Sequence, residues 1–306
     1  MARIIVIAGP TAVGKSALSI ALAKRLNGEI ISADSMQIYR GMDIGTAKAS
    51  VAEQDGIVHH LLDIRDPNEE YSCADYATDA RRCVEDILAR GKTPIFCGGT
   101  GLYIKQALCD QVVSSPPGDP ALRAQLESRD PEENYRELQE CDPESAAAIH
   151  PNNHRRVIRA LEIYRLSGVP KSEWDRRTPT EEYRSDAMLY CLTAPREQLY
   201  QRIDRRVDVM LELGLYDEVR ALDLAPDSTA GQAIGYKEML GCIRGEQTLA
   251  EAADAIRLAS RRYAKRQLTW FRHQKGFVPL DVSQFSNFEE IVNFVAKSFE
   301  KSKNML

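Results

Sequence analysis

Eight residues near the N-terminus, GPTAVGKS at positions 9 to 16, have the types and spacing of a loop that binds phosphate groups. Two glycines allow the backbone to curl so that successive N–H groups point at an anion, and the lysine adds a mobile cation. The serine hydroxyl can bind Mg²⁺. The loop consists of Gly9, Pro10, Thr11, Ala12, Val13, Gly14, Lys15 and Ser16. It predicts a site for a di- or triphosphate, with Mg²⁺ held through Ser16.

The segments around this loop alternate between strand and helix patterns. An apolar run, RIIVIA, precedes the loop, and SALSIALAKRL follows it with helical spacing. Further strands are expected at residues 29–34, 59–63, 94–99, 187–193 and 277–281. Such alternation indicates a parallel sheet with helices on both faces and ligands at the carboxyl ends of the strands. The predicted fold is therefore α/β, with a P-loop NTPase-like sheet.

One long stretch, residues 116–184, interrupts this alternation. It begins and ends with proline-containing polar segments, and the helical patterns inside it are short. We interpret it as a helical insertion domain in a core formed by residues 1–115 and 185–306. A helical segment at about 197–270 belongs to the core.

Composition limits the classes of protein that are possible. No run of about 18 apolar residues is present, and the apolar N-terminus is too short for a signal peptide. The seven cysteines include no CxxC pair, which favours reduced structural thiols over zinc. We expect a cytoplasmic protein with no membrane contact and no obligate protein partner.

Charge is distributed unevenly along the chain. The net charge is −5, yet residues 257–275 contain seven basic residues and no acid. A second basic group lies in HPNNHRRVIRALEIYR, residues 150–165. Local basic surfaces on an acidic protein favour a polyanionic partner, although a solvated helix face would give the same pattern.

Two aspartates follow predicted strands, Asp34 in IISAD and Asp63 in HHLLD. Either could support the water shell of a metal, as a kinase or an ATPase requires, so that function remains open. The stretch after Asp34 concentrates polar side chains and glycines in SADSMQIYRGMDIGTAK. This pattern is typical of a substrate-reading loop.

Seven motifs together resemble the tRNA dimethylallyltransferase family. In chain order they are GPTAVGKS, SADSMQIYRGMDIGTAK, HHLLDIRDP, CGGTGLY, HPNNHRRVIRALE, QAIGYKE and RYAKRQLTWFR. The resemblance covers residues 9–272 and implies transfer of a dimethylallyl group to the exocyclic amine of the adenosine at tRNA position thirty-seven. The phosphate loop would then hold dimethylallyl diphosphate, so its phosphates belong to the leaving group.

The resemblance implies roles for three residues outside the loop. Asp34 would orient the amine and take its proton, and Thr100 of GGTGLY would form a hydrogen bond close by. Arg206 would stabilise the departing diphosphate, and it lies four residues after Arg202 on a basic helix face.

RNA contacts follow from the same resemblance, with the anticodon stem-loop as the expected partner. The expected contact residues are Asp34, Ser35, Met36, Gln37, Arg155, Arg156, Val157, Ile158, Arg159, Gln232, Gly235, Tyr236, Lys237, Arg262, Lys265 and Arg266. Two alternatives remain: an adenylate dimethylallyltransferase, which needs no RNA surface, and a small-molecule kinase, which would turn over ATP.

Overall fold

The computed structural model describes residues 3–109, 116–177 and 182–303. The chain divides into two compact units, one formed by Met1–Leu108 with Tyr183–Leu306 and the other by Cys109–Glu182. The predicted insertion, residues 116–184, overlaps the smaller unit. Residues 178–181, in the polar stretch expected to end the insertion, lie outside the described residues, as do residues 110–115 just before it.

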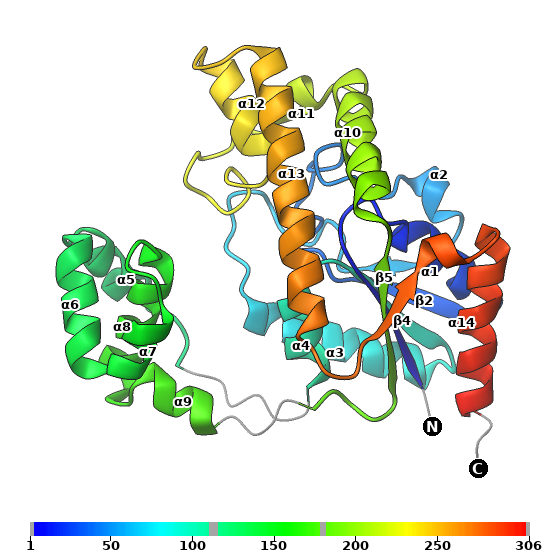
Figure 1. The fold of residues 1–306 in the computed structure, drawn as a ribbon, viewed down its shortest axis with the longest axis horizontal. Helices are drawn as coiled ribbons and strands as arrows, with labels where there is room; N and C mark the ends of the chain where they lie inside the picture. The colour runs from blue at the N-terminus through cyan, green and yellow to red at the C-terminus, as the bar shows by residue number, and fades with distance from the viewer. Residues whose placement is uncertain (1–2, 110–115, 178–181, 304–306) are drawn as a thin grey trace. The chain divides into compact units, whose positions relative to one another are not determined.

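Six parallel strands form one sheet in the larger unit, in the order β3-β2-β4-β1-β5-β6 (Figure 1). They are β1 (Ile4–Ala8), β2 (Gly28–Ser32), β3 (His59–His60), β4 (Thr93–Gly98), β5 (Ala187–Thr193) and β6 (Val278–Asp281). All six predicted strands are present. β3 is shorter than predicted because Leu61 and Asp63 adopt positive φ angles and turn the backbone out of the sheet.

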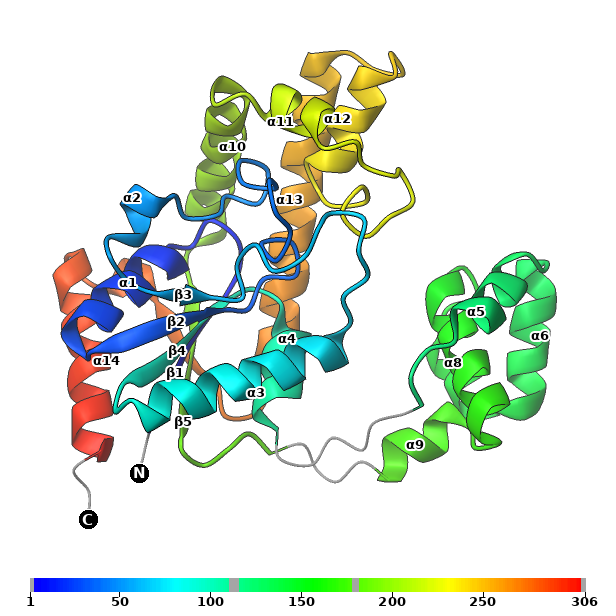
Figure 2. The same cartoon turned by 180° about the vertical axis from the view of Figure 1, so that it is seen from behind.

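Helices cover both faces of this sheet (Figures 1 and 2). Ile5 and Ile7 of β1 pack against α1 and α14, whereas Ile4 and Val6 pack against α3 and α4. This alternation follows from the two-residue period of a strand and requires an apolar residue at every position of β1. The covering helices are α1 (Lys15–Arg25), α3 (Cys73–Ala89), α4 (Gly101–Leu108) and α14 (Phe288–Lys303). The fold is P-loop NTPase-like, as predicted.

Four further helices form an arm beside the carboxyl ends of the strands (Figure 1). They are α10 (Arg196–Glu212), α11 (Leu215–Ala221), α12 (Tyr236–Ile243) and α13 (Leu249–Arg272). Their shared core also includes Ile38, Tyr39 and Met42, from the segment that follows β2. The short elements α2 (Val51–Gln54) and the 3₁₀ helix Val282–Gln284 complete the larger unit.

The smaller unit is helical and has its own apolar core, which includes Leu126, Leu138 and Leu161. Its helices are α5 (Pro120–Glu127), α6 (Pro131–Cys141), α7 (Pro143–Ala148), α8 (His154–Ser167) and α9 (Lys171–Arg177). Each of the first three begins with a proline after an aspartate whose carboxylate accepts backbone N–H groups. Aspartate caps followed by proline are strong helix-start signals, so local sequence defines these short helices. No helix in the described part of the chain is long and apolar enough to span a membrane.

Candidate active site

The phosphate loop connects the buried end of β1 to the first turn of α1. Gly14, with φ 105°, caps this helix, and Lys15 begins it. Gly9 has φ 141°, and a Cβ atom there would lie 2.6 Å from the carbonyl oxygen of Leu192. A side chain would therefore be excluded at Gly9 by both conformation and space. The loop exposes backbone N–H groups at a helix N-terminus, which favours an anion.

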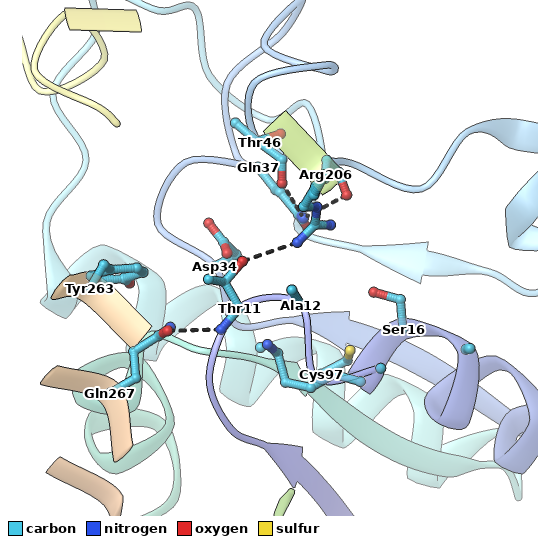
Figure 3. Close-up of a pocket in the computed structure, with 15 residues that line it drawn as sticks. Thr11, Ala12, Ser16, Asp34, Gln37, Thr46, Cys97, Arg206, Tyr263 and Gln267 are labelled. Carbon is cyan, nitrogen blue, oxygen red and sulfur yellow. Dashed lines mark hydrogen bonds between the residues drawn. The ribbon is translucent and has the colours of Figure 1, made fainter. Parts of the chain in front are cut away.

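A cavity of about 280 Å³ opens over this loop (Figure 3). It is lined by Thr11, Ala12, Gly14, Lys15, Ser16, Ala17, Asp34, Gln37, Thr46, Ala47, Cys97, Gly98, Arg206, Tyr263 and Gln267. The lining comes from the carboxyl ends of β1, β2 and β4 and from two helices of the arm. This is where a parallel sheet places its ligands.

Two cations line the cavity, from distant parts of the chain. The ammonium of Lys15 donates to the carbonyl oxygen of Pro10 at 2.7 Å, and Nη1 of Arg206 donates to Oγ1 of Thr11 at 3.0 Å. Burial lowers the pKa of Lys15 to about 8, although the nearby Cys97 and Asp34 partly oppose this. Burial also lowers the pKa of Arg206. Desolvated cations of this kind are stabilised by an anionic ligand.

Asp34 follows β2 and lines the same cavity. Its Oδ1 accepts a hydrogen bond from the backbone N–H of Met36 at 2.9 Å, which fixes the turn. Thr100, at the end of the neighbouring strand β4, accepts from the backbone N–H of Ser35 at 3.1 Å and donates to the Ser35 hydroxyl at 3.4 Å. Thr100 therefore holds the residue beside Asp34, and Ser35 links the two predicted residues.

The predicted substrate-reading loop forms another wall of the cavity. Gln37 and Thr46 both line it, and Nε2 of Gln37 donates to the carbonyl oxygen of Thr46 at 3.2 Å (Figure 3). The Thr46 hydroxyl donates to the carbonyl oxygen of Met42 at 2.6 Å. The loop therefore folds back on itself and presents polar groups near Asp34.

Sequence reasoning missed two residues of α13, Tyr263 and Gln267, that line the cavity. Gln267 accepts from the backbone N–H of Thr11 at 2.9 Å and donates to the carbonyl oxygen of Gly99 at 3.0 Å. It joins the phosphate loop to the end of β4. Burial raises the pKa of Tyr263 to about 12. The sequence signal that could have found Gln267 is its place on the apolar face of a helix, between Ala264 and Phe271. A buried glutamine there needs hydrogen-bond partners.

The basic segment at the end of α13 is less charged in the fold than in the sequence. Arg257 pairs with Asp208 and Asp254, and Arg261 pairs with Asp204. Two of these ion pairs, Arg257 with Asp208 and Arg261 with Asp204, join α13 to α10, and they neutralise part of the basic segment.

Arg262, Lys265 and Arg266 behave differently, and all three are exposed. Within the described residues none of them pairs with a carboxylate, and the guanidinium of Arg266 lies 5.5 Å from the ring centre of Tyr263. These three cations are available to an anionic partner. So are Arg272 and Lys275, which are also exposed and pair with no carboxylate among the described residues.

The other predicted RNA contacts separate into exposed and buried groups. In the larger unit Gln232 and Lys237 are exposed, whereas Tyr236 is fully buried and Gly235 is buried in the backbone before α12. The side chain of Tyr236 packs in the arm, so it has no surface to offer to RNA.

The smaller unit shows the same division along α8. Arg155 and Arg156 are exposed, while Val157 and Ile158 pack in the unit's core. Arg159 pairs with the buried carboxylate of Glu162. Helical periodicity explains the result, since one face of an amphipathic helix packs in the core and the opposite face is solvated. The RNA-contact hypothesis for this helix therefore narrows to its exposed arginines.

Comparisons with known proteins agree with this geometry. A family model described as IPP transferase matches residues 37–274. The chain is 48% identical to the tRNA dimethylallyltransferase of Anoxybacillus flavithermus and 49% identical to that of Geobacillus kaustophilus, with 99% of each chain covered.

Solved structures give the same result. The tRNA isopentenylpyrophosphate transferase of Bacillus halodurans is 44% identical, with a TM-score of 0.72 over 100% of this chain and 99% of that one. A eukaryotic dimethylallyltransferase acting on tRNA is 35% identical, with a TM-score of 0.84 over 99% of this chain and 80% of that one. The chain belongs to the IPP transferase family.

Proposed function

We propose that this chain transfers a dimethylallyl group from dimethylallyl diphosphate to the exocyclic amine of the adenosine at tRNA position thirty-seven. The observation that carries the proposal is a single cavity in which Lys15 and Arg206 accompany the carboxylate of Asp34. The cations suit a diphosphate leaving group, and the carboxylate suits an amine that must lose a proton. The names and high identity of the bacterial relatives support the same reaction.

The donor half of the reaction needs stabilisation of negative charge. The bond between the allylic carbon and the diphosphate oxygen breaks as charge accumulates on the diphosphate. The side chains of Lys15 and Arg206 are held by hydrogen bonds to the loop before the donor arrives, and the loop's backbone N–H groups are fixed by its fold. Such preorganised groups stabilise developing charge without reorganising during the reaction.

The acceptor half needs an oriented amine. The lone pair of the adenine amine is delocalised into the ring, so the amine is a poor nucleophile. In our proposal Asp34 accepts one amine hydrogen as the new N–C bond forms and takes that proton. The turn fixed by Met36, Ser35 and Thr100 keeps the carboxylate in place. Proton transfer of this type contributes typically 10²–10⁴-fold to a rate.

Mg²⁺ fits the donor side of the cavity. The Ser16 hydroxyl lines the cavity at the first turn of α1, and oxygen is the ligand that Mg²⁺ prefers. In phosphate loops the serine hydroxyl takes this role, with phosphate oxygens and waters as further ligands. When bound, the ion would neutralise charge on the diphosphate.

An anticodon stem-loop is the acceptor that the exposed cations favour. RNA loops are recognised through splayed bases and phosphate contacts, and a base inside such a loop must leave its stack to reach a recessed site. Arg262, Lys265 and Arg266 on the larger unit, and Arg155 and Arg156 on the smaller one, could offset that cost by contacting phosphates.

The test is an acceptor competition. The protein is mixed with Mg²⁺, labelled dimethylallyl diphosphate and either total tRNA, an anticodon stem-loop with adenosine at position thirty-seven, or AMP. We expect label in both RNAs, with AMP poorer by orders of magnitude. A specificity constant for AMP within about tenfold of that for the stem-loop, a difference of only ~1.4 kcal/mol, would favour the adenylate enzyme instead. Turnover of ATP without any prenyl transfer would favour the kinase.

A further inference from the structure

Glu218, at the start of α11, lies outside the cavity but holds the loop that forms its acceptor wall. Its carboxylate accepts three consecutive backbone N–H groups, from Asp43 at 3.1 Å, Ile44 at 2.7 Å and Gly45 at 3.1 Å. It also accepts the hydroxyl of Tyr236 at 2.5 Å. One side chain from the helical arm therefore satisfies most of the backbone donors at the tip of the loop.

Steric fit reinforces this attachment. A Cβ atom at Gly45 would collide with the ring of Tyr236, which is fully buried. The loop backbone and α12 therefore approach each other as closely as glycine permits. Glu218 therefore binds the backbone of residues 43–45, and the close contact with Tyr236 fixes Gly45 in addition.

The fixed tip is connected directly to the cavity. Thr46 and Ala47 follow Gly45 in the chain and line the cavity, and Gln37 donates to the carbonyl oxygens of both at 3.2 and 3.5 Å. A second anchor lies on the other side, where the nearly buried ammonium of Lys48 donates to Asp43 and Asp63, each at 2.6 Å. A shift of residues 43–45 would therefore move the polar groups beside Asp34.

The phosphate loop is anchored by different residues. Gln267 and Arg206 both hold Thr11, and Lys15 donates to Pro10 within the loop itself. None of these bonds involves Glu218, so the donor groups do not depend on it.

We propose that Glu218 is a positioning residue. It holds the loop that forms the acceptor wall of the cavity, and it thereby controls the specificity constant for RNA without controlling the affinity for the donor. This inference rests on the proposed function, because it concerns how the adenosine is received. Negative charge is part of the role, since hydrogen bonds to an ionised acceptor are shorter and stronger than neutral ones.

The test compares E218Q with D217N, a matched control at the neighbouring exposed residue, whose ion pair is with Arg220 of the same helix. A glutamine must direct its NH₂ group at one or more backbone donors, which leaves them without an acceptor. We expect the specificity constant for the stem-loop to fall about tenfold or more in E218Q. The affinity for dimethylallyl diphosphate should stay within about twofold, and D217N should match the wild type in both measurements.

Hydrogen exchange gives a readout that is independent of catalysis. In E218Q the amides of residues 43–45 should exchange faster, while those of β1 and the phosphate loop should not change. Tyr236→Phe removes only the hydroxyl and keeps the ring against Gly45, so it should lower RNA use by a few-fold and tests the same anchor if E218Q folds poorly.

Three results would overturn the inference. RNA use in E218Q could remain at the wild-type level, donor affinity could fall by the same factor as RNA use, or exchange could rise equally throughout the larger unit. A wild-type protein that transfers nothing to RNA would instead overturn the proposed function itself, which separates the two failures.

Discussion

Two groups of cations in the larger unit differ in how they are built. Lys15 and Arg206 are desolvated, and each is held by a hydrogen bond to the phosphate loop. Arg262, Lys265 and Arg266 are exposed on α13, and no carboxylate in the described ranges pairs with them. Coulomb interactions are strong in a desolvated site and screened at the surface. The first group suits one small dianion at a fixed place, and the second suits many phosphates of a large partner.

Mutations in the two groups should therefore have different effects. Loss of a buried cation should slow the chemical step and leave RNA binding intact. Loss of an exposed cation should weaken RNA binding in a salt-dependent way and leave the chemical step intact.

The largest loss of activity is expected at Asp34, the carboxylate that lines the cavity with Lys15 and Arg206. Asp34→Asn keeps the shape of the side chain but removes its capacity to take a proton. The single-turnover rate should fall by roughly 10²–10⁴, with donor and tRNA affinities nearly unchanged. Rapid-quench measurements with the stem-loop and saturating donor would test this. Loss of diphosphate affinity would point to a role in the metal's water shell instead.

A somewhat smaller loss is expected at Lys15. Lys15→Ala removes a preorganised cation that faces the leaving group, so transfer should slow by about 10²–10³. The affinity for tRNA should not change. Lys24→Ala is the matched control, because Lys24 lies on the same helix and pairs with Asp55 at the surface. Near wild-type transfer by Lys15→Ala would contradict the leaving-group role.

The sequence predicted the strand, loop and helix around Lys15 well, because local rules determine their conformation. The glycines, the lysine and the flanking strand and helix are adjacent in the chain, so their spacing encodes the loop. The start of α3 is encoded locally in the same way, by a capping box between Ser72 and Asp75.

Long-range packing explains what the sequence could not predict. Gln267 meets Thr11 across 256 positions, and Glu218 reaches the loop at 43–45 across more than 170. Neither residue type is diagnostic by itself, since both contacts depend on how α11 and α13 pack. The number of basic residues in the segment does not show that Arg257 is paired and Arg262 is not, because one of the aspartates that neutralise Arg257 lies on α10.

Proton linkage at Lys15 predicts a pH dependence confined to the donor side. With a pKa lowered to about 8, Lys15 loses its charge in the free protein as the pH rises through that value. The specificity constant for the donor should fall by about tenfold between pH 7 and pH 9, because this constant reports the free protein. Bound diphosphate favours the charged lysine, so kcat should change less.

Two observations check this assignment. The pKa of Tyr263, at about 12, lies above the range of the experiment. Lys15→Arg should show no decline in its remaining activity, since a guanidinium stays charged at these pH values. A Lys15→Arg variant with the wild-type profile would assign the titration to another group.

The smallest effect is expected at the exposed cations of α13, and it concerns the affinity for tRNA. It compares unpaired and paired cations on the same helix. If Arg262 and Lys265 contact phosphates, their single alanine variants should weaken tRNA binding a few-fold. Each should also reduce the slope of log affinity against log salt by about 0.7–0.9. Arg257→Ala is the matched control, because Arg257 already pairs with two aspartates and should leave the slope nearly unchanged. Titrations of labelled stem-loop at several salt concentrations would measure all three slopes. If Arg262 and Lys265 behave like Arg257, exposure on α13 is not a criterion for RNA contact, and this helix face is merely solvated.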